Sequence, residues 1–91
     1  MNTPAFHRVS KALADPRRFD ILRAITAGRG EVPCKTLLTK FKITPATMSH
    51  HLKDLVNAGL IEGRKEAQCM YFTPCRDVLA AYRAELQRKL G

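Results

Sequence analysis

The 91-residue sequence has no tryptophan and only eight acidic residues, which are outnumbered by sixteen lysines and arginines. The formal charge of +8 and an isoelectric point near 9.9 indicate a polyanionic partner, most commonly nucleic acid. A membrane surface is less favoured, because such binding needs a basic amphipathic helix with a broad apolar face and the basic residues here are scattered. An enzyme is not expected, because the chain has no glycine-rich phosphate loop and no recognisable nucleophile with a base.

Long apolar runs and a disulfide framework are also missing. No run approaches the roughly 18 consecutive apolar residues of a membrane span, and Met1-Asn2-Thr3-Pro4 lacks the layout of a signal peptide. The three cysteines, Cys34, Cys69 and Cys75, are an odd number in a chain without a secretion signal. We therefore expect reduced thiols and a cytoplasmic protein.

The length predicts one domain, residues 1–91, because two domains of this size would have too little apolar surface for separate cores. A domain this small buries only a modest fraction of its surface on folding. Dimerisation is therefore expected to add stability.

Helix signals occur four times before residue 60. Thr3 with Pro4 is expected to begin a first helix, and Asp15 with Pro16 a second one that ends near Gly28. Pro33 is expected to open a short third helix whose Leu37, Leu38 and Phe41 face inward. Thr44 and Pro45 begin the fourth helix, which stops at Gly59. The third and fourth helices, so closely joined, predict a helix-turn-helix.

The apolar spacing within these segments predicts their inward faces. The first predicted helix carries Phe6, Val9 and Leu13 at helical spacing. The second carries Phe19, Leu22 and Ile25, flanked by Ile21, and the third carries Leu37, Leu38 and Phe41. The fourth carries Met48, Leu52, Leu55 and Val56.

The last third of the chain is predicted to form a hairpin followed by a helix. Residues 60–65 and 69–73 resemble short strands around Glu66-Ala67-Gln68. Thr73 and Pro74 are then expected to begin a last helix with an apolar stripe of Val78, Leu79, Tyr82, Leu86 and Leu90. The predicted fold is mainly α with a small β-hairpin, a winged helix-turn-helix in the order α-α-α-α-β-β-α.

Two blocks of this sequence carry a family signature, ALADPRRFDIL at residues 12–22 and SHHLKDLVNAGLI at residues 49–61. They resemble the ArsR/SmtB family of winged helix-turn-helix repressors, and the similarity continues through Arg64-Lys65-Glu66 and Met70-Tyr71-Phe72. The resemblance implies a homodimer built on the first and last helices that represses transcription from an inverted-repeat operator. The expected dimer contacts are Phe6, Val9, Leu79, Tyr82 and Leu86.

The outward face of the fourth helix predicts the DNA contacts. Thr47 and His50 are expected to hydrogen-bond base edges and Ala46 to touch a thymine methyl group, while Ser49 and Thr44 bond phosphates. Lys53, Arg64, Lys65 and Gln68 complete the predicted set. His51 points about 100° away from His50, so we expect it to pack against the domain.

The hairpin tip departs from the family pattern, which has glycine and a basic residue where this chain has Ala67 and Gln68. Alanine tolerates a positive φ poorly, so we expect the turn to use another geometry. The basic residue's phosphate-reaching charge is absent at Gln68.

Known metal sites of the family are not matched, so no metal or other cofactor is expected. In the family, one metal site is a Cys-x-Cys pair on the third helix, and the matching positions here are Pro33 and Lys35, with Cys34 alone between them. A second family site uses Asp and His pairs on the last helix, and the last helix here has no histidine. Cys34 and Cys75 fall near predicted helix starts, where nearby cations could lower a thiol pKa, but inert packing is favoured. An unidentified effector remains open, as does the alternative of a basic architectural or RNA-binding module.

Overall fold

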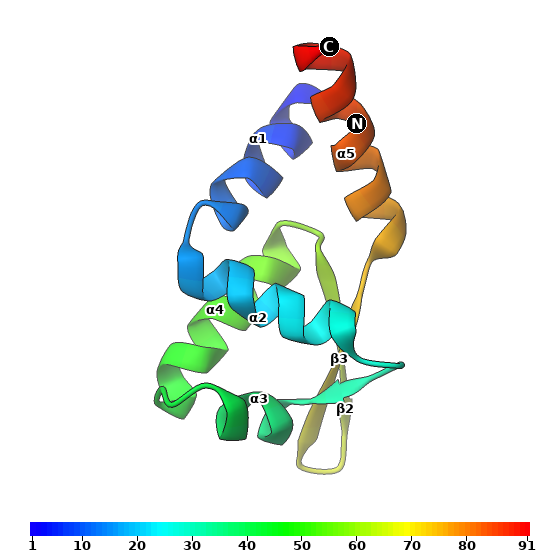
Figure 1. The fold of residues 1–91 in the computed structure, drawn as a ribbon. Helices are drawn as coiled ribbons and strands as arrows, with labels where there is room; N and C mark the ends of the chain where they lie inside the picture. Colours follow the sequence, from blue (N-terminus) through cyan, green and yellow to red (C-terminus); the bar gives the residue numbers. More distant parts are fainter.

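Five helices and three short strands follow one another in the computed structural model, which describes residues 1–91 (Figure 1). Their order is α1 (Thr3–Leu13), α2 (Pro16–Ala27), β1 (Val32–Pro33), α3 (Cys34–Lys40), α4 (Pro45–Asn57), β2 (Ile61–Glu66), β3 (Cys69–Pro74) and α5 (Arg76–Leu90). The winged helix-turn-helix prediction is confirmed, with β1 as an additional strand that the sequence analysis missed.

Two regions are apparent in the ribbon. α1 and α5 come together at one end, with both chain termini, and we call this pair the arm (Figure 1). The remaining elements form the body. The arm is held together by the rings of Phe6 and Tyr82, which stack with centroids 5.0 Å apart, and by a 2.7 Å hydrogen bond between the Ser10 and Tyr82 hydroxyls.

Side-chain caps begin three of the helices. The Asp15 carboxylate accepts a hydrogen bond from the Arg18 amide at 3.0 Å, and the Thr44 hydroxyl accepts one from the Thr47 amide at 3.1 Å, both as predicted. The predicted cap at Thr3 is wrong, because Asn2 accepts the bond from the Ala5 amide at 2.8 Å and Thr3 is already helical. Asparagine is at least as good a cap as threonine, so the helix gains one residue at no cost.

The prolines at 33 and 74 are not the first residues of helices, although Pro33 is the N-cap residue of α3. Pro33 pairs with Tyr71 in β1, and Pro74 pairs with Ile61 at the end of β3. Their helices begin at Cys34 and Arg76. Proline lacks an amide hydrogen, which does no harm on an edge strand or at a strand end. Pairing with the hairpin therefore overrides the helix-start signal.

The core contains fourteen buried residues, all of them apolar, from every helix and strand except α5, together with Phe41 and Leu60 in the connections on either side of α4. They are Val9, Ala12, Ile21, Leu22, Ile25, Val32, Leu37, Phe41, Met48, Leu52, Leu55, Leu60, Ile61 and Phe72. Leu13 and Leu38 pack partly buried against them. No helix combines the length and apolarity needed to cross a bilayer.

Three residues of the predicted apolar stripes are exposed. Phe19 is 43% exposed, Val56 is 41% exposed and Leu90 is 81% exposed. The buried side of α2 runs through positions 18, 21, 22 and 25, so Phe19 lies off that side and Arg18 begins it. The predicted helical period is confirmed, but the predicted phase is wrong, because Phe19 is apolar and yet lies on the exposed side.

The three strands form an antiparallel sheet in the order β1-β3-β2. Glu66 pairs with Cys69, which leaves Ala67 and Gln68 as a two-residue turn. The expectation that this turn avoids a positive φ is wrong, because Ala67 has φ of 54°. A positive φ at the first central residue alone matches a type II′ turn, whose twist suits an antiparallel hairpin.

We predict that Ala67→Gly stabilises the protein by about 0.5–1 kcal/mol, because a left-handed residue with a side chain costs more than the added freedom of glycine in the unfolded chain. Urea unfolding measures the change. Ala80→Gly, on the exposed side of α5, is the matched control and should lower stability by about 1 kcal/mol. Equal losses in both variants would refute the strained turn.

Candidate nucleic-acid interface

α3 and α4 form a helix-turn-helix joined by residues 41–44. Phe41 is 8% exposed and belongs to the core, and Ile43 packs partly buried against it. Lys42 lies between them and is exposed. Two apolar anchors in four residues therefore hold the turn against the body and set the start of α4.

α4 separates its residues by face. Met48, Leu52 and Leu55 are at most 4% exposed in the core. The residues predicted to face DNA are all exposed, namely Ala46, Thr47, Ser49, His50 and Lys53. Their exposure agrees with the predicted helical phase and leaves a polar surface on the N-terminal part of the helix.

Thr44 is exposed but its hydroxyl is occupied. The oxygen accepts the Thr47 amide, and the same hydroxyl lies 2.9 Å from the Thr47 hydroxyl, to which it donates. Thr44 thus serves as the cap of α4, which accounts for the hydroxyl without a phosphate. Thr47 keeps its own hydroxyl hydrogen free to donate.

His51 is half-buried, whereas His50 is exposed. Its neighbour across the helices is Asp15, whose pKa is lowered mainly by the hydrogen bond from the Arg18 amide and to a smaller extent by the charges of Arg18 and His51. This position is consistent with a structural role. No group of three or more His, Cys, Asp or Glu side chains is arranged to hold a metal ion.

Arg64 lies on the β2–β3 hairpin, which we call the wing, and its guanidinium is bound by side chains of the same protein. Its guanidinium donates to both carboxylate oxygens of Glu31, at 2.7 and 2.8 Å, and lies 3.2 Å from the Glu66 carboxylate. It also stacks over the Tyr71 ring, 4.9 Å from the centroid. Hydrogen bonds to Glu31 raise the pKa of Arg64, and the same bonds lower the pKa of Glu31. We call these four residues the wing clamp.

The wing clamp alters the predicted set of phosphate contacts. Glu31 lies 33 positions before Arg64, and nothing in the local sequence indicated the pair. Two carboxylates neutralise the guanidinium, so a DNA phosphate would have to compete for it. The side chains of Lys65 and Gln68 are exposed and form no hydrogen bond or ion pair within the chain, so they stay available on the wing.

Lys42 is a candidate that the sequence analysis missed. It is exposed in the turn just before the Thr44 cap and forms no ion pair within the chain. The predicted phosphate-contacting charges lie only on the fourth helix and the hairpin. The signal was its place within the helix-turn-helix, next to the end of the helix that would enter the groove.

The cysteines do not form a reactive cluster. Burial raises the pKa of Cys34, and burial together with the charges of Glu62 and Asp77 raises the pKa of Cys75. The suggestion that nearby cations could lower these values is therefore wrong. Cys69 is exposed near the wing tip. Raised pKa values leave Cys34 and Cys75 as thiols rather than thiolates at neutral pH.

The predicted dimer contacts divide into two groups. Val9 is completely buried within one chain, so it belongs to the protomer's own core and has no surface for a partner. The other four, Phe6, Leu79, Tyr82 and Leu86, are half-buried on the arm. Leu79 and Tyr82 pack against the core, and Leu86 does not.

The wing clamp predicts a pH-dependent stability. Because the folded pKa of Glu31 is below its ordinary 4.5, its stabilisation is present above that value and is lost as the pH falls through the lowered folded pKa. Glu31→Gln should therefore lower stability at pH 7 and match the wild type in more acidic solution. Urea unfolding across this range measures the difference. The effect is small, because the pair is solvent-exposed. Asp20→Asn, in a 3.8 Å surface pair, is the control, and equal pH profiles for both variants would contradict the clamp.

Residues 13–64 match the model of a helix-turn-helix domain family. The chain is 32% identical over 75 residues to the HTH-type transcriptional regulator YceK of Bacillus subtilis, covering 82% of this chain and 75% of that protein. It is 39% identical over 57 residues to the arsenical resistance operon repressor of Staphylococcus xylosus, covering 63% of this chain and 53% of the repressor.

The fold matches solved structures over nearly its full length. The homodimeric winged helix-turn-helix DNA-binding domain of Mb0332 from Mycobacterium bovis, a possible ArsR-family transcriptional regulator, superimposes with a TM-score of 0.75 at 31% identity. The match covers 96% of this chain and 79% of that one. The polar face of α4, the hairpin beside it and these similarities agree with one another. The chain therefore belongs to the ArsR family of winged helix-turn-helix transcriptional regulators.

Proposed function

We propose that this regulator is a homodimeric repressor that binds an inverted-repeat operator in duplex DNA, with α4 in the major groove and the β2–β3 hairpin beside it. The observation that carries the proposal is α4, which is buried on one face and exposes Thr47, Ser49 and His50 on the other. In a helix-turn-helix, the N-terminal residues of the second helix approach the base edges. The proposal assigns no catalytic activity and places the protein with the DNA in the cytoplasm.

The exposed face of α4 supplies groups for both kinds of DNA contact. Thr47 and His50 can hydrogen-bond to bases, and the Ala46 methyl can contact thymine. Ser49, Lys53, Lys42 and Lys65 would contact phosphates, together with Gln68 at the wing tip. Phosphate contacts place the protein on the duplex, and the net charge of +8 supports this attraction.

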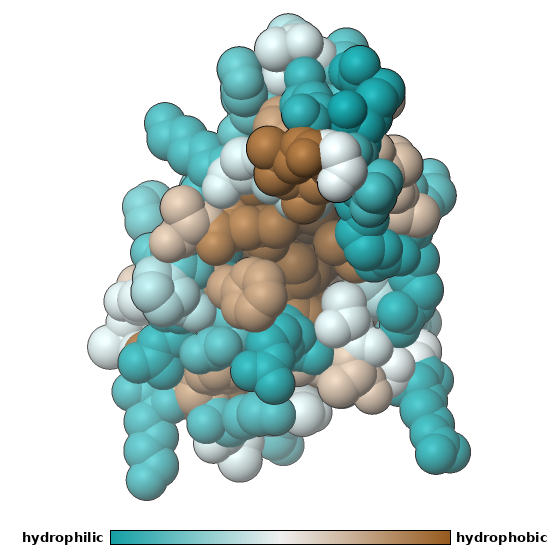
Figure 2. Space-filling view, turned by 45° about the horizontal axis from the view of Figure 1, so that its top comes forward, coloured by the Kyte–Doolittle hydropathy of each residue, from teal (hydrophilic) through white to brown (hydrophobic).

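A second copy of the chain would cover apolar surface that one copy leaves exposed. α5 carries no fully buried residue, and its Leu90 is 81% exposed. Figure 2 shows an apolar area that runs from the arm at the top of the molecule to the centre of this face. Phe6, Leu79, Tyr82 and Leu86 are the proposed contacts, and Mb0332, which has this fold, is homodimeric.

Repression is proposed from the similarity to the arsenical resistance operon repressor. A dimer bound across a promoter would exclude other proteins from it. An effector that releases the DNA stays unidentified. The proposal includes no thiolate chemistry, since the pKa values of Cys34 and Cys75 are raised.

Selection of bound sequences from a random duplex library tests the proposal at physiological salt. We expect an enriched inverted repeat with half-sites about one helical turn apart. Absence of any enriched sequence would overturn the proposal in favour of architectural binding, and preferential capture of RNA over duplex DNA would favour an RNA-binding module.

The selected operator then separates base contacts from phosphate contacts. His50→Ala should reduce the ratio of operator to random-DNA affinity by about tenfold, a typical cost of one lost base contact. Lys53→Ala should weaken both affinities alike and lower the salt slope by about 1. Fluorescence anisotropy measures each, with Lys11→Ala on α1 as a control that removes the same charge. If His50→Ala weakened binding to operator and to random DNA equally, the assignment of His50 as a base contact would be refuted.

Leu86→Arg should weaken dimerisation by about a hundredfold or more, because it places an unpaired charge in an apolar contact. Leu79→Arg should do the same but also disturb the core against which Leu79 packs. Sedimentation velocity over a concentration series measures the dissociation constant. Gln87→Arg adds the same charge on the exposed side of α5 and should leave it unchanged. A wild-type-like sedimentation profile for Leu86→Arg would refute the proposed interface.

A further inference from the structure

Three helices meet at Arg18, the third residue of α2. Its backbone amide donates to Asp15, the cap of its own helix, at 3.0 Å. Its guanidinium donates to the carbonyl oxygens of Ala12 at 2.7 Å and Lys11 at 3.2 Å, both in α1. A third guanidinium bond, 3.0 Å long, reaches the Asp54 carboxylate on α4. The side chain is only 16% exposed. One residue therefore connects α1, α2 and α4.

Each bond answers a local requirement of the helices it joins. The last carbonyls of a helix lack partners within it, and a cation is favoured there by the helix dipole. Arg18 supplies both donors and charge to the last turn of α1. Asp54 lies near the C-terminal end of α4, where a carboxylate is disfavoured and the last turn contains no basic residue. Arg18 supplies that compensation from outside the helix.

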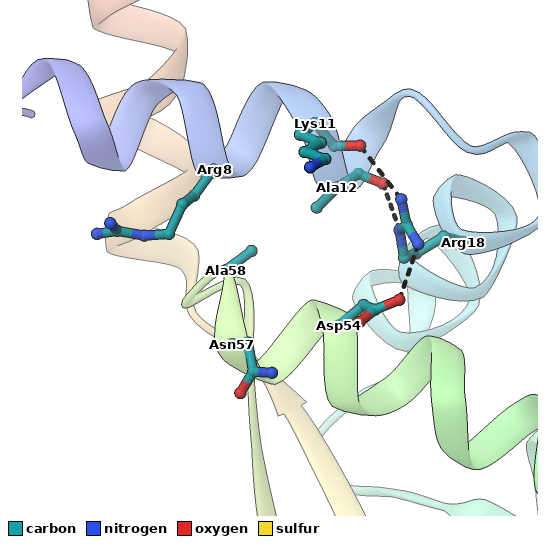
Figure 3. A pocket seen from close by; sticks show the side chains of 7 residues that line it. All are labelled: Arg8, Lys11, Ala12, Arg18, Asp54, Asn57 and Ala58. Atoms are coloured by element: carbon teal, nitrogen blue, oxygen red, sulfur yellow. Dashed lines mark hydrogen bonds and ion pairs between the residues drawn. The ribbon is translucent and has the colours of Figure 1, made fainter.

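Packing alone does not join α1 to α4 at this point. A cavity of about 280 Å³ lies there, lined by Arg8, Lys11, Ala12, Arg18, Asp54, Asn57 and Ala58. Figure 3 shows the guanidinium between the α1 carbonyls and Asp54 at one edge of this space, while Arg8 and Asn57 point away from that contact. This pocket is open to solvent, so the facing surfaces there lack the close packing that fixes orientation in the core. The Arg18 bonds are what spans the gap.

We propose that Arg18 is a positioning residue that, through Asp54, sets the orientation of α4 relative to the arm and so determines the half-site spacing the dimer accepts. The inference rests on the proposed function, in which the arm joins two protomers and each α4 reads one half-site. α1 belongs to the arm, and α4 carries the exposed face proposed to contact the bases, which we call the reading surface. A bond between the two helices would therefore transmit the dimer geometry to the DNA. The planar fork of arginine suits this task, because it fixes direction as well as distance.

The test uses a set of duplexes that carry the same half-sites with one base pair removed or added between them. Wild-type protein should prefer one spacing. Asp54→Asn, which keeps the shape of the side chain, and Arg18→Lys, which keeps the charge, should each reduce that preference by about three- to tenfold, the scale of the net contribution of one hydrogen bond. Affinity for a duplex with a single half-site should stay unchanged, which a simple loss of folding would not allow.

Asp20→Asn is the matched control. It changes the net charge by the same amount, and its carboxylate makes only a 3.8 Å exposed pair with Arg23 on the same helix α2. If Asp54→Asn and Arg18→Lys keep the spacing preference of this control, while circular dichroism shows them folded, the inference is overturned. A wild-type protein without any spacing preference would instead refute the dimeric binding mode, and this inference with it.

Discussion

Burial of Met48, Leu52 and Leu55 in the core is the contact on which the reading surface depends. These three residues fix the rotation of α4 about its axis, so every other residue of the helix has a determined direction. The polar N-terminal face is exposed because the apolar face is buried, and the Thr44 cap fixes where the helix begins. A DNA-contacting helix that could rotate would lose its register against the base edges.

Charge in this protein is abundant, but only part of it is free. Arg18 is bound to two carbonyls and a carboxylate, and Arg64 to two carboxylates and an aromatic ring. Both are structural connectors, one between helices and one between the wing and the segment before β1. The net charge of +8 already subtracts the carboxylates of these networks, so the lysines and arginines outside them would supply the electrostatic attraction to a DNA backbone.

The body buries its apolar residues within one chain more completely than the arm does. The body encloses an apolar core with no unsatisfied buried side-chain polar atom. The arm depends on the stacking of Phe6 on Tyr82 and on Val9, and its α5 buries no residue completely. A small domain has little interior for its surface, so apolar residues placed at one end gain most from a second copy. The same end is tied to α4 through Arg18.

The sequence by itself determined the features that follow from neighbouring residues. Helix periods, the caps at Asp15 and Thr44 and the hairpin were all predictable, because each depends on contacts within one turn or one hairpin. The exposed side of α4 was predictable from the spacing of the apolar residues that the core buries. The local signals failed where a more distant partner intervened. Pro33 and Pro74 looked like helix starts and became strand residues, since pairing in the sheet decided their role.

Only the tertiary structure decided which charges are bound and which apolar residues are enclosed. Arg18 meets Asp54 across 36 positions and Arg64 meets Glu31 across 33, and no periodicity reports such pairs. Val9 and Phe19 are both apolar residues at helical spacing, yet one is fully buried and the other 43% exposed. Pattern gives the period of a helix, whereas its phase and its partners come from the other elements that pack against it.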